Sequence, residues 1–507
     1  MGLKILLVEL PIDSWNRYAR RYLPNPGTLA LATYLKSKSC DVKLIDTYAE
    51  GIGWKKLAKF IRKEDPDIIG SSSYTPDIYG RILLARITKK INPSIVTVLG
   101  GCHVTLVPEE TLRLAKAIDY AVLGEGEETF FELVQALGNS VSSKDMGNIR
   151  GIAYLNDDTL IKTEPRPFIK NLDSLPMPDY SLIPMARYTN SYYFPYPANQ
   201  GFSATFSRGC PEKCNFCAES AFWQSSWRGR SAKAVVEELK VLNKKYGKRF
   251  FLFYDDNFMF NRQRNIEFIE EMRKSGLKIE YRIGARVDTL LRDRALLKDL
   301  RSVGLTALQI GVESFDQDVL NGMHKNYNVE KMKELSHSLK EAGIPFPMLF
   351  FVIGNYNDNR KTLLDITRKS KKYGFNAIQV TSLTPWPGTH FFEEVDNRGL
   401  IQVKDYRLYD FKNAIMPTKY LTTQKVDFWR FYLFFKWYSD IGVFLSNMKN
   451  RYLRHYHLYS VSILLLNIFC YRFIHFFKIW NLFWYNRLID RIHKEHAEYI
   501  KLAKSQK

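Results

Sequence analysis

Cysteine is scarce in this sequence, and the few cysteines do not form the framework of a secreted scaffold. Six cysteines are spread over 507 residues, and Cys40, Cys102 and Cys470 lie far from one another along the chain. Disulfide-rich proteins carry many closely spaced cysteines, so a reducing cytoplasm is the expected location. The first residues, "MGLKILLVELPID", become polar too soon for a secretory signal and predict a buried strand.

Two other patterns are also missing. The net charge is +21, but no block of consecutive lysines and arginines marks a nucleic-acid-binding tail. A nucleic acid is therefore not the expected partner, and the basic surface favours other anionic groups, such as phospholipid headgroups or phosphorylated and carboxylated ligands. No G-x-G-x-x-G motif follows the first apolar run, "KILLV", and this argues against a dinucleotide site.

Residues 1–145 alternate short apolar runs with helical stretches. The runs are "KILLV", "VKLID", "DIIGS", "IVTVLGG" and "YAVLGEG". Strands as apolar as these, separated by helices, indicate a parallel sheet that is covered on both faces. The right-handed crossover rule then predicts a doubly wound, Rossmann-like α/β domain whose ligands bind beyond the carboxyl ends of the strands.

The alternation stops at residues 146–200 and returns at residues 201–415. In the first of these ranges, "RGIAYLNDDTLIKTEPRPF" predicts a hairpin that turns at residues 156–158, and a proline-punctuated linker follows it. The second range carries six strand–helix repeats, which fit a partial (β/α)6 barrel better than a full eight-fold one. Active sites of such barrels lie at the carboxyl ends of the strands.

Residues 416–507 form a basic, aromatic-rich region that we predict to be a helical cap. Residues 421–507 hold 14 lysines and arginines against 5 acidic residues, and 22 of these 87 residues are aromatic. The most apolar stretch, "YHLYSVSILLLNIFCY", has 16 residues, whereas a membrane-spanning helix needs about 20. The region therefore either packs on the barrel as ordinary core or lies in a membrane interface with its basic residues at the headgroups.

The remaining three cysteines lie close together in "SRGCPEKCNFCAES". Cys210, Cys214 and Cys217 have the spacing C-x3-C-x2-C and follow the first strand of the predicted barrel. Thiolates are natural ligands of iron–sulfur clusters, and three of them can hold three irons of a [4Fe–4S] cube while the fourth stays open to a small molecule. The alternatives are a zinc site completed by a remote ligand such as His103, or cysteines that only pack.

With the aromatic Phe216 before its last cysteine, this motif resembles that of the radical S-adenosylmethionine (SAM) superfamily. The resemblance implies that Cys210, Cys214 and Cys217 hold a [4Fe–4S] cluster whose unique iron binds SAM, and that reduction cleaves SAM to a 5′-deoxyadenosyl radical. It also implies SAM contacts at the ends of the later strands, where the alternative for each residue is local capping or a salt bridge. The implied contacts are Asp255 or Asp256 for the amino group, Arg286 for the carboxylate, Glu313 and Ser314 for the ribose and methionine parts, and Gly354 in "FFVIGNYND", which lacks the family's usual Gly-Glu ending.

A Rossmann-like domain that precedes such a barrel resembles the cobalamin-binding class of radical SAM enzymes. The stretches "PNPGTLALATYLKSK", "GGCHVTLVPEETL" and "DYAVLGEGEETFFELV" resemble the signatures of that class. No D-x-H-x-x-G cobalt-ligand motif is present, so the lower face of cobalamin is either open or served by His103, and a domain that binds nothing is a further alternative. The resemblance implies that glycines let the backbone approach the corrin ring and that small hydroxyls bond its side chains, and these residues are Ser71, Ser72, Ser73, Gly100, Gly101, Thr105, Gly124 and Gly126.

Within this class, "TPWPGTHFFEEV" and "YDFKNAIMPTKYLT" resemble the group that contains the anaerobic magnesium-protoporphyrin IX monomethyl ester cyclase. The resemblance implies an enzyme that functionalises an unactivated carbon of a hydrophobic small molecule. C-methylation is the leading hypothesis, and oxidative cyclisation of a tetrapyrrole or lipid is the second. An electron donor such as ferredoxin or flavodoxin is implied, and a peripheral membrane contact through residues 421–507 stays open. A cluster-bearing sensor protein without turnover is the hypothesis of a different class.

Overall fold

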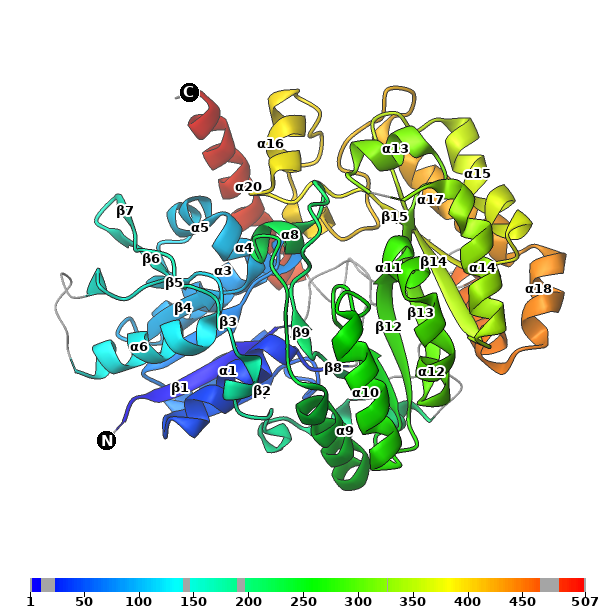
Figure 1. Ribbon diagram of the computed structural model, residues 1–507. Helices are drawn as coiled ribbons and strands as arrows, with labels where there is room; N and C mark the ends of the chain where they lie inside the picture. Colours follow the sequence, from blue (N-terminus) through cyan, green and yellow to red (C-terminus); the bar gives the residue numbers. More distant parts are fainter. Residues whose placement is uncertain are drawn as a thin grey trace.

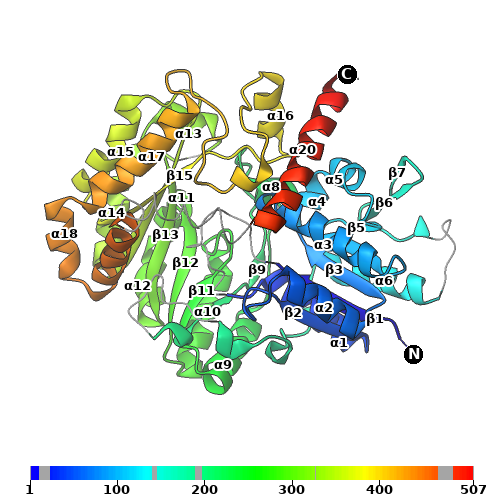
Figure 2. The ribbon, with the colours of Figure 1, turned by 180° about the vertical axis from the view of Figure 1, so that it is seen from behind.

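The computed structural model describes residues 2–10, 23–139, 146–188, 197–325, 327–465 and 483–505. These residues form two α/β domains side by side, and C-terminal helices contact both of them (Figures 1 and 2). The predicted fold class, a Rossmann-like domain followed by a partial barrel and a helical C-terminal region, is confirmed.

Five parallel strands form the centre of the N-terminal sheet, in the order β2-β1-β3-β4-β5. Their apolar sequences predict this position, because the middle of β1 is almost completely shielded from solvent. The strand order reverses beside β1, which creates the switch point of a doubly wound sheet. The strands are β1 (Lys4–Glu9), β2 (Asp41–Asp46), β3 (Ile68–Ser72), β4 (Val96–Gly100) and β5 (Tyr120–Val122), and the helices are α1 (Pro26–Ser37), α2 (Trp54–Glu64), α3 (Ile78–Ile91), α4 (Cys102–Leu106), α5 (Pro108–Leu114) and α6 (Gly126–Gly138).

The hairpin of β6 (Ile152–Asn156) and β7 (Thr159–Lys162) turns where the sequence predicts, with Asp157 in the left-handed region at φ 54°. The sequence pattern predicts that this hairpin lies outside the first domain, but β6 pairs antiparallel with β5 and extends the N-terminal sheet to seven strands. Pairing satisfies the backbone groups that the outer edge of β5 would otherwise expose. The hairpin therefore belongs to the first sheet in structure.

The linker that follows is partly buried between the domains. Tyr180 and Tyr188 are both buried, and their rings contact Phe202 of the barrel with centroid distances of 5.6 and 6.3 Å. Tyr188 also donates a hydrogen bond from its hydroxyl to Asp46 at 3.0 Å. The linker thus ties the end of β2 to the first barrel strand.

Six parallel strands form the second sheet, in the order β8-β11-β12-β13-β14-β15. Each strand pairs with its neighbours in chain order, and within the described residues β8 and β15 do not pair, so the barrel is partial as predicted. The strands are β8 (Gly201–Ala204), β11 (Phe250–Phe253), β12 (Glu280–Arg286), β13 (Leu305–Glu313), β14 (Phe346–Ile353) and β15 (Ala377–Ser382). The helices are α9 (Ala232–Tyr246), α10 (Arg262–Ser275), α11 (Val287–Arg292), α12 (Leu297–Ser302), α13 (Gln317–Gly322), α14 (Met332–Glu341) and α15 (Arg360–Lys372).

The C-terminal helices are α16 (His390–Asn397), α17 (Thr423–Tyr438), α18 (Ile441–Met448), a helix over residues 451–465, and α20 (Phe483–Ser505). Helix α17 packs on the barrel through the fully buried Leu433 and Trp437. Helix α20 returns to the first domain, where Glu495 pairs with Arg86 of α3 at 2.7 Å. Among the described helices, none is at once long and apolar enough to cross a membrane. Residues 466–482, which include the last six residues of the apolar stretch, lie outside the described residues.

Candidate active site

The cysteine loop lies at the carboxyl end of β8, between β9 (Ser207–Arg208) and α8 (Ala218–Phe222). Strand β9 pairs with β10 (Arg228–Gly229) and so closes the base of the loop. Gly209 has φ 83°, and a Cβ atom at this position would lie 2.2 Å from the carbonyl oxygen of Ser226. Only glycine fits there, and this turn presents the cysteines beyond the strand.

The three thiols of the loop are free, and burial opposes the ionisation of Cys210 and Cys217. Burial raises the pKa of the Cys210 thiol to about 11 and that of the Cys217 thiol to about 12. Cys214 is buried, and the Nη1 atom of Arg286 donates a hydrogen bond to its Sγ at 3.3 Å. Iron binding at this loop must therefore displace protons from the thiols.

The donor set fits an iron–sulfur cluster better than a single ion. Within the described residues, no three or more His, Cys, Asp or Glu side chains converge tightly enough to hold one metal ion. In a cluster each thiolate binds a different iron, so the sulfurs need not meet at one point. The cations of Arg286 and Lys325 lie near Cys214 and would offset the negative charge of three thiolates.

Lys325 is a residue that the sequence analysis missed. Its ammonium group is buried and pairs with Glu313 at 2.7 Å. Burial lowers the pKa of Lys325, but the nearby Glu313 carboxylate outweighs burial and raises this pKa above its usual value. Glu313 itself lies in the left-handed region at φ 63°, at an irregularity in the pairing of β13 with β14. Glu313 ends β13 and Lys325 follows the next helix, α13, and no motif of the sequence indicates that the two side chains pair.

The two adjacent aspartates after β11 point in different directions. Asp255 is buried and accepts hydrogen bonds from the Ser207 hydroxyl and, at 3.4 Å, from the backbone N–H of Phe206. Asp256 faces the cysteine loop, where the Gly209 N–H donates to it. Although part of the residue reaches solvent, desolvation of the carboxyl and the nearby Glu219 raise the pKa of Asp256 to about 8. Of the pair, Asp256 is the one turned toward the site.

Three further predicted SAM contacts are engaged within the protein. Arg286 forms an ion pair with Asp288 at 2.7 Å. The Ser314 hydroxyl accepts a hydrogen bond from the N–H of Asp316 at 3.0 Å, and the N–H of Gly354 donates to Asp358 at 2.9 Å. These are the local roles that the sequence analysis named as alternatives, and the roles toward SAM stay predictions.

Three of the hydroxyls predicted to contact cobalamin bond backbone groups at the edge of the sheet, one between β3 and β1 and two among the segments after β3, β4 and β5. Ser71 donates to the carbonyl of Val8 at 2.6 Å, and Ser73 donates to the carbonyl of Gly100 at 2.8 Å. Thr105 donates to the carbonyl of Gly101 at 2.8 Å and accepts from the N–H of Gly124 at 3.0 Å. These hydroxyls shape the carboxyl edge of the sheet, and their contact with cobalamin stays a prediction.

The four glycines of this edge differ in their roles. Gly101 has φ 95°, and a Cβ there would lie 2.6 Å from the backbone nitrogen of Ser73 and 2.7 Å from the Ser72 hydroxyl, so it lets the neighbouring loop approach. Gly124 has φ 75°, and a Cβ there would meet the Phe168 ring at 4.0 Å, an ordinary contact, so the backbone conformation rather than crowding favours glycine. Gly100 and Gly126 are neither strained nor tightly packed.

His103 is directed into the protein. Its ring is buried, with Nδ1 3.0 Å from the Thr75 hydroxyl and the ring edge against Tyr406. Burial lowers the pKa of His103 to about 4. The side chain thus serves as a neutral internal group, and in this arrangement it is offered neither to a zinc ion at the cysteine loop nor to cobalt.

The two domains are fastened together beside the cysteine loop by ion pairs that the sequence analysis also missed. Arg208 bonds Glu125 at 2.6 Å and Glu127 at 2.5 Å, and Arg228 bonds Glu125 at 2.8 Å. Both carboxylates are buried, and both flank the start of α6. We call these four residues the interdomain clamp. The stretch "GEGEE" drew attention for its glycines, but its acidic residues are the ones that bind the loop.

Further contacts bring the carboxyl edges of the two sheets face to face. Helix α4 lies against α8 (Figures 1 and 2). Gly388, after β15, has φ 79°, and a Cβ there would lie 2.7 Å from the carbonyl oxygen of Leu106. The cysteine loop, the ends of β3, β4 and β5, and the segment after β15 therefore surround one region between the domains, which is the candidate active site.

Known proteins share both halves of this arrangement. Residues 17–134 match the model of the B12 binding domain, and residues 204–383 match that of the Radical SAM superfamily. An uncharacterized methyltransferase of Pyrococcus horikoshii is 32% identical over 424 residues, which are 84% of this chain and 90% of that protein. The chain belongs to the cobalamin-binding radical SAM family. The anaerobic magnesium-protoporphyrin IX monomethyl ester cyclase of Cereibacter sphaeroides is 33% identical to this family member, over 76% of the chain and 62% of the cyclase.

A solved structure shares the fold of this radical SAM protein along its whole length. The cobalamin-dependent S-adenosylmethionine radical enzyme OxsB superimposes with a TM-score of 0.69 at 16% identity, over 100% of this chain and 80% of that one. Family membership makes the protein an enzyme, with a [4Fe–4S] cluster, SAM and cobalamin as its cofactors, and confirms these predictions from the sequence.

The buried His103 predicts an acid-sensitive step in the stability of this radical SAM protein. The folded state keeps the ring neutral down to a pKa of about 4, whereas the unfolded chain takes up the proton near pH 6.5. Stability is therefore lost as the pH falls from about 6.5 to about 4, by about 3 kcal/mol in total. Melting curves across this range should show the loss in the wild type and much less of it in His103→Gln. The exposed His337→Gln is the control and should follow the wild type, and a His103→Gln profile equal to the wild type would contradict the assignment.

Proposed function

We propose that this enzyme C-methylates an unactivated carbon of a hydrophobic small molecule. The observation that carries the proposal is the interdomain clamp, which holds the cysteine loop against the carboxyl edge of the cobalamin-binding domain. Two cofactors can act on one substrate only if their sites open into the same space. When bound, the cluster would supply the electron that cleaves SAM, and cobalamin would carry the methyl group. Relatives named as methyltransferases support the same choice.

Separate groups of residues would bind the cluster, SAM and cobalamin. Cys210, Cys214 and Cys217 would hold the cluster, and Arg286 would offset its charge through the contact with Cys214. Asp256 faces the loop and would accept hydrogen bonds from the amino group of SAM. Gly124, whose positive φ favours glycine, lies at the edge of the first sheet where the corrin would approach. We also propose that residues 1–145 form the core of the cobalamin-binding domain, 146–200 the hairpin and linker, 201–415 the radical SAM barrel and 416–507 the helical C-terminal region.

Oxidative cyclisation is the second candidate function. The Cereibacter relative is named for a cyclase that acts on a tetrapyrrole ester, and it matches 76% of this chain. The same cofactor pair would then remove hydrogen from the substrate without adding a methyl group.

Methylation and cyclisation can be distinguished with SAM that carries a trideuterated methyl group. The anaerobically reconstituted protein, with cobalamin and dithionite, is incubated with hydrophobic extracts of a strain that lacks it. Methylation predicts a product that carries the label, together with both 5′-deoxyadenosine and S-adenosylhomocysteine. Cyclisation predicts a product without deuterium and without S-adenosylhomocysteine. If neither nucleoside product forms, the enzymatic proposal fails and a cluster-bearing sensor remains.

We extend the proposal to the substrate, the electron donor and the location of the enzyme. The substrate is a small molecule, and we propose that it is hydrophobic because a relative acts, by its name, on a porphyrin ester. We also propose an electron donor such as ferredoxin or flavodoxin, and a cytoplasmic location. A peripheral membrane contact through residues 421–507 is supported by the basic and aromatic composition of that region.

A further inference from the structure

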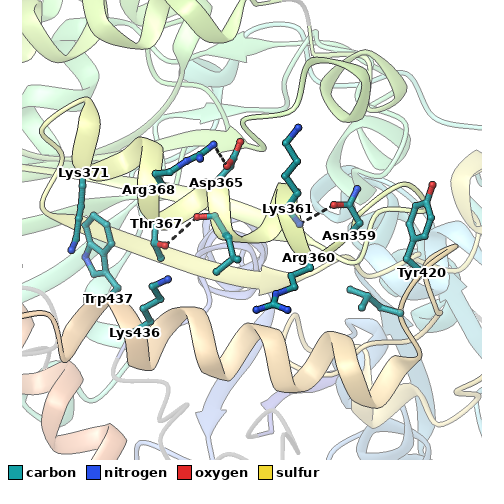
Figure 3. Close-up of a pocket in the computed structure, with 12 residues that line it drawn as sticks. Asn359, Arg360, Lys361, Asp365, Thr367, Arg368, Lys371, Tyr420, Lys436 and Trp437 are labelled. Atoms are coloured by element: carbon teal, nitrogen blue, oxygen red, sulfur yellow. Dashed lines mark hydrogen bonds and ion pairs between the residues drawn. The ribbon is translucent and has the colours of Figure 1, made fainter.

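A groove of about 860 Å³ lies between α15 and α17 (Figure 3), and its lining shares no residue with the candidate active site. Its floor includes Trp437, and its volume lies within the range of small-molecule sites. The family's known cofactors leave this groove without an assigned role. The residues that line it are Asn359, Arg360, Lys361, Leu364, Asp365, Thr367, Arg368, Lys371, Tyr420, Leu421, Lys436 and Trp437.

Cationic side chains line both sides of the groove, whereas Asp365 is the single acidic residue of the lining (Figure 3). Arg368 is paired with Asp365 at 2.5 Å. Arg360, Lys361 and Lys436 are exposed, and in the described part of the chain they have no carboxylate partner. The groove therefore presents an uncompensated positive charge, which suits an anionic group such as a phosphate.

An exposed apolar face adjoins the groove on α17 and continues onto α18. Phe428, Phe431 and Phe435 recur at helical spacing on α17 and are 59%, 39% and 41% exposed. We call this face the aromatic ridge, and it includes Ile441, Phe444 and Leu445 of α18, which are 74%, 39% and 57% exposed. Lys436 lies one residue after Phe435 and lines the groove, so one cation of the groove shares a helix with the ridge, whereas the others come from α15.

The ridge is not explained by packing within the fold, because the opposite face of α17 already meets the barrel through Leu433 and Trp437. Soluble surfaces rarely keep this many large apolar side chains exposed side by side unless they bind something. A second copy of the chain is a poor occupant, because a two-fold contact would bring the same cations together. RNA bases could stack on the phenylalanines of the ridge but would leave the aliphatic Ile441 and Leu445 uncovered, so RNA fits the ridge less completely than a lipid interface does.

We infer that the aromatic ridge inserts into the interface of an anionic lipid bilayer and that the groove between α15 and α17 binds the phosphate of a lipid headgroup. Aromatic and aliphatic side chains at the boundary of the acyl chains, with lysines and arginines at headgroup level, are the arrangement of interfacial helices. This inference makes the general membrane contact proposed above specific, and it does not depend on which reaction the enzyme performs. A membrane-docked barrel would also receive a hydrophobic substrate from the lipid phase.

The test is co-sedimentation of the full-length, cluster-loaded protein with vesicles. We expect binding to vesicles of phosphatidylcholine with phosphatidylglycerol, and weak binding to phosphatidylcholine alone. Lys361→Glu combined with Lys436→Glu should weaken the binding by roughly 20-fold or more, since each cation near an anionic surface contributes about fivefold. Phe428→Ser combined with Phe435→Ser should abolish the part of the binding that resists high salt. All of these side chains are exposed, so the folded state and the cluster should be retained.

Matched controls decide between the groove and general charge. Lys233→Glu combined with Lys298→Glu changes the net charge equally on exposed sites of α9 and α12, and Leu502→Ser removes an apolar side chain that is 63% exposed on α20. Both controls should bind like the wild type. Vesicle binding that the groove and ridge variants do not change would place the contact elsewhere and overturn this inference alone. No vesicle binding, with a dimer or RNA binding that the ridge variants abolish, would overturn the membrane contact altogether.

Discussion

Replacing Cys214 with alanine is expected to remove both the brown visible absorption of the iron–sulfur cluster and all formation of 5′-deoxyadenosine from SAM. Cys214 is the most buried of the three loop cysteines, and it carries the hydrogen bond from Arg286. Two thiols cannot hold three irons of the cube, so the cluster is lost, and the open iron that would bind SAM is lost with it. The measurement is the absorption spectrum and the nucleoside product after anaerobic reconstitution with dithionite and SAM.

The matched control is Cys40→Ala, the same substitution at another free cysteine of the chain. Cys40 lies between α1 and β2, away from the cysteine loop, and its replacement should leave the spectrum and the product unchanged. If Cys214→Ala keeps both the chromophore and 5′-deoxyadenosine formation, the loop does not hold the catalytic cluster and the proposed function falls with it.

The second large effect is expected at the interdomain clamp. In Glu125→Ala, the buried guanidinium of Arg228 loses its carboxylate and Arg208 loses one of two. Breaking a buried ion pair from one side costs about 3–5 kcal/mol, because the remaining charge stays buried without compensation. We expect a melting temperature lower by roughly 5 °C or more, and a loss of product formation that exceeds the loss of cluster, since the variant keeps all three cysteines but loosens the loop from the cobalamin-binding domain.

Glu128→Ala provides the comparison on the same helix. Glu128 is about half exposed and meets Arg166 at 3.5 Å on the surface, where an ion pair contributes little. This variant should melt and react like the wild type. Equal behaviour of the Glu125 and Glu128 variants would show that the clamp does not position the loop.

The fold follows from local patterns to a large extent. The apolar runs of β1, β3 and β4 and the repeated strands of the barrel predict two parallel sheets, because a strand that is buried on both faces must be apolar throughout. The hairpin of β6 and β7 shows the limit of this reasoning. Its turn could be recognised from Asp157 and its neighbours, but its pairing with β5 depends on which sheet edge lies open in space.

Some features of the candidate active site can be predicted from the sequence, and others need the structure. The three cysteines indicate an iron–sulfur loop by their spacing, since all three ligands lie in one short segment. The choice of Asp256 over Asp255 needs the structure, because adjacent residues after a strand turn to opposite sides. His103 could be noticed as a histidine near the edge of the sheet, yet only the packing of Thr75 and Tyr406 shows that it is an internal group.

By itself, the amino-acid sequence determined the alternation of strands and helices, the hairpin turn at residues 156–158 and the position of the cluster loop, because these depend on neighbours within a few residues. The tertiary structure alone decided that Lys325 compensates Glu313, that Glu125 and Glu127 bind Arg208, and that the aromatic ridge is left uncovered. The physical reason is that burial and charge compensation depend on distances in space, and residues that are not adjacent in the chain reach those distances only when the whole chain folds.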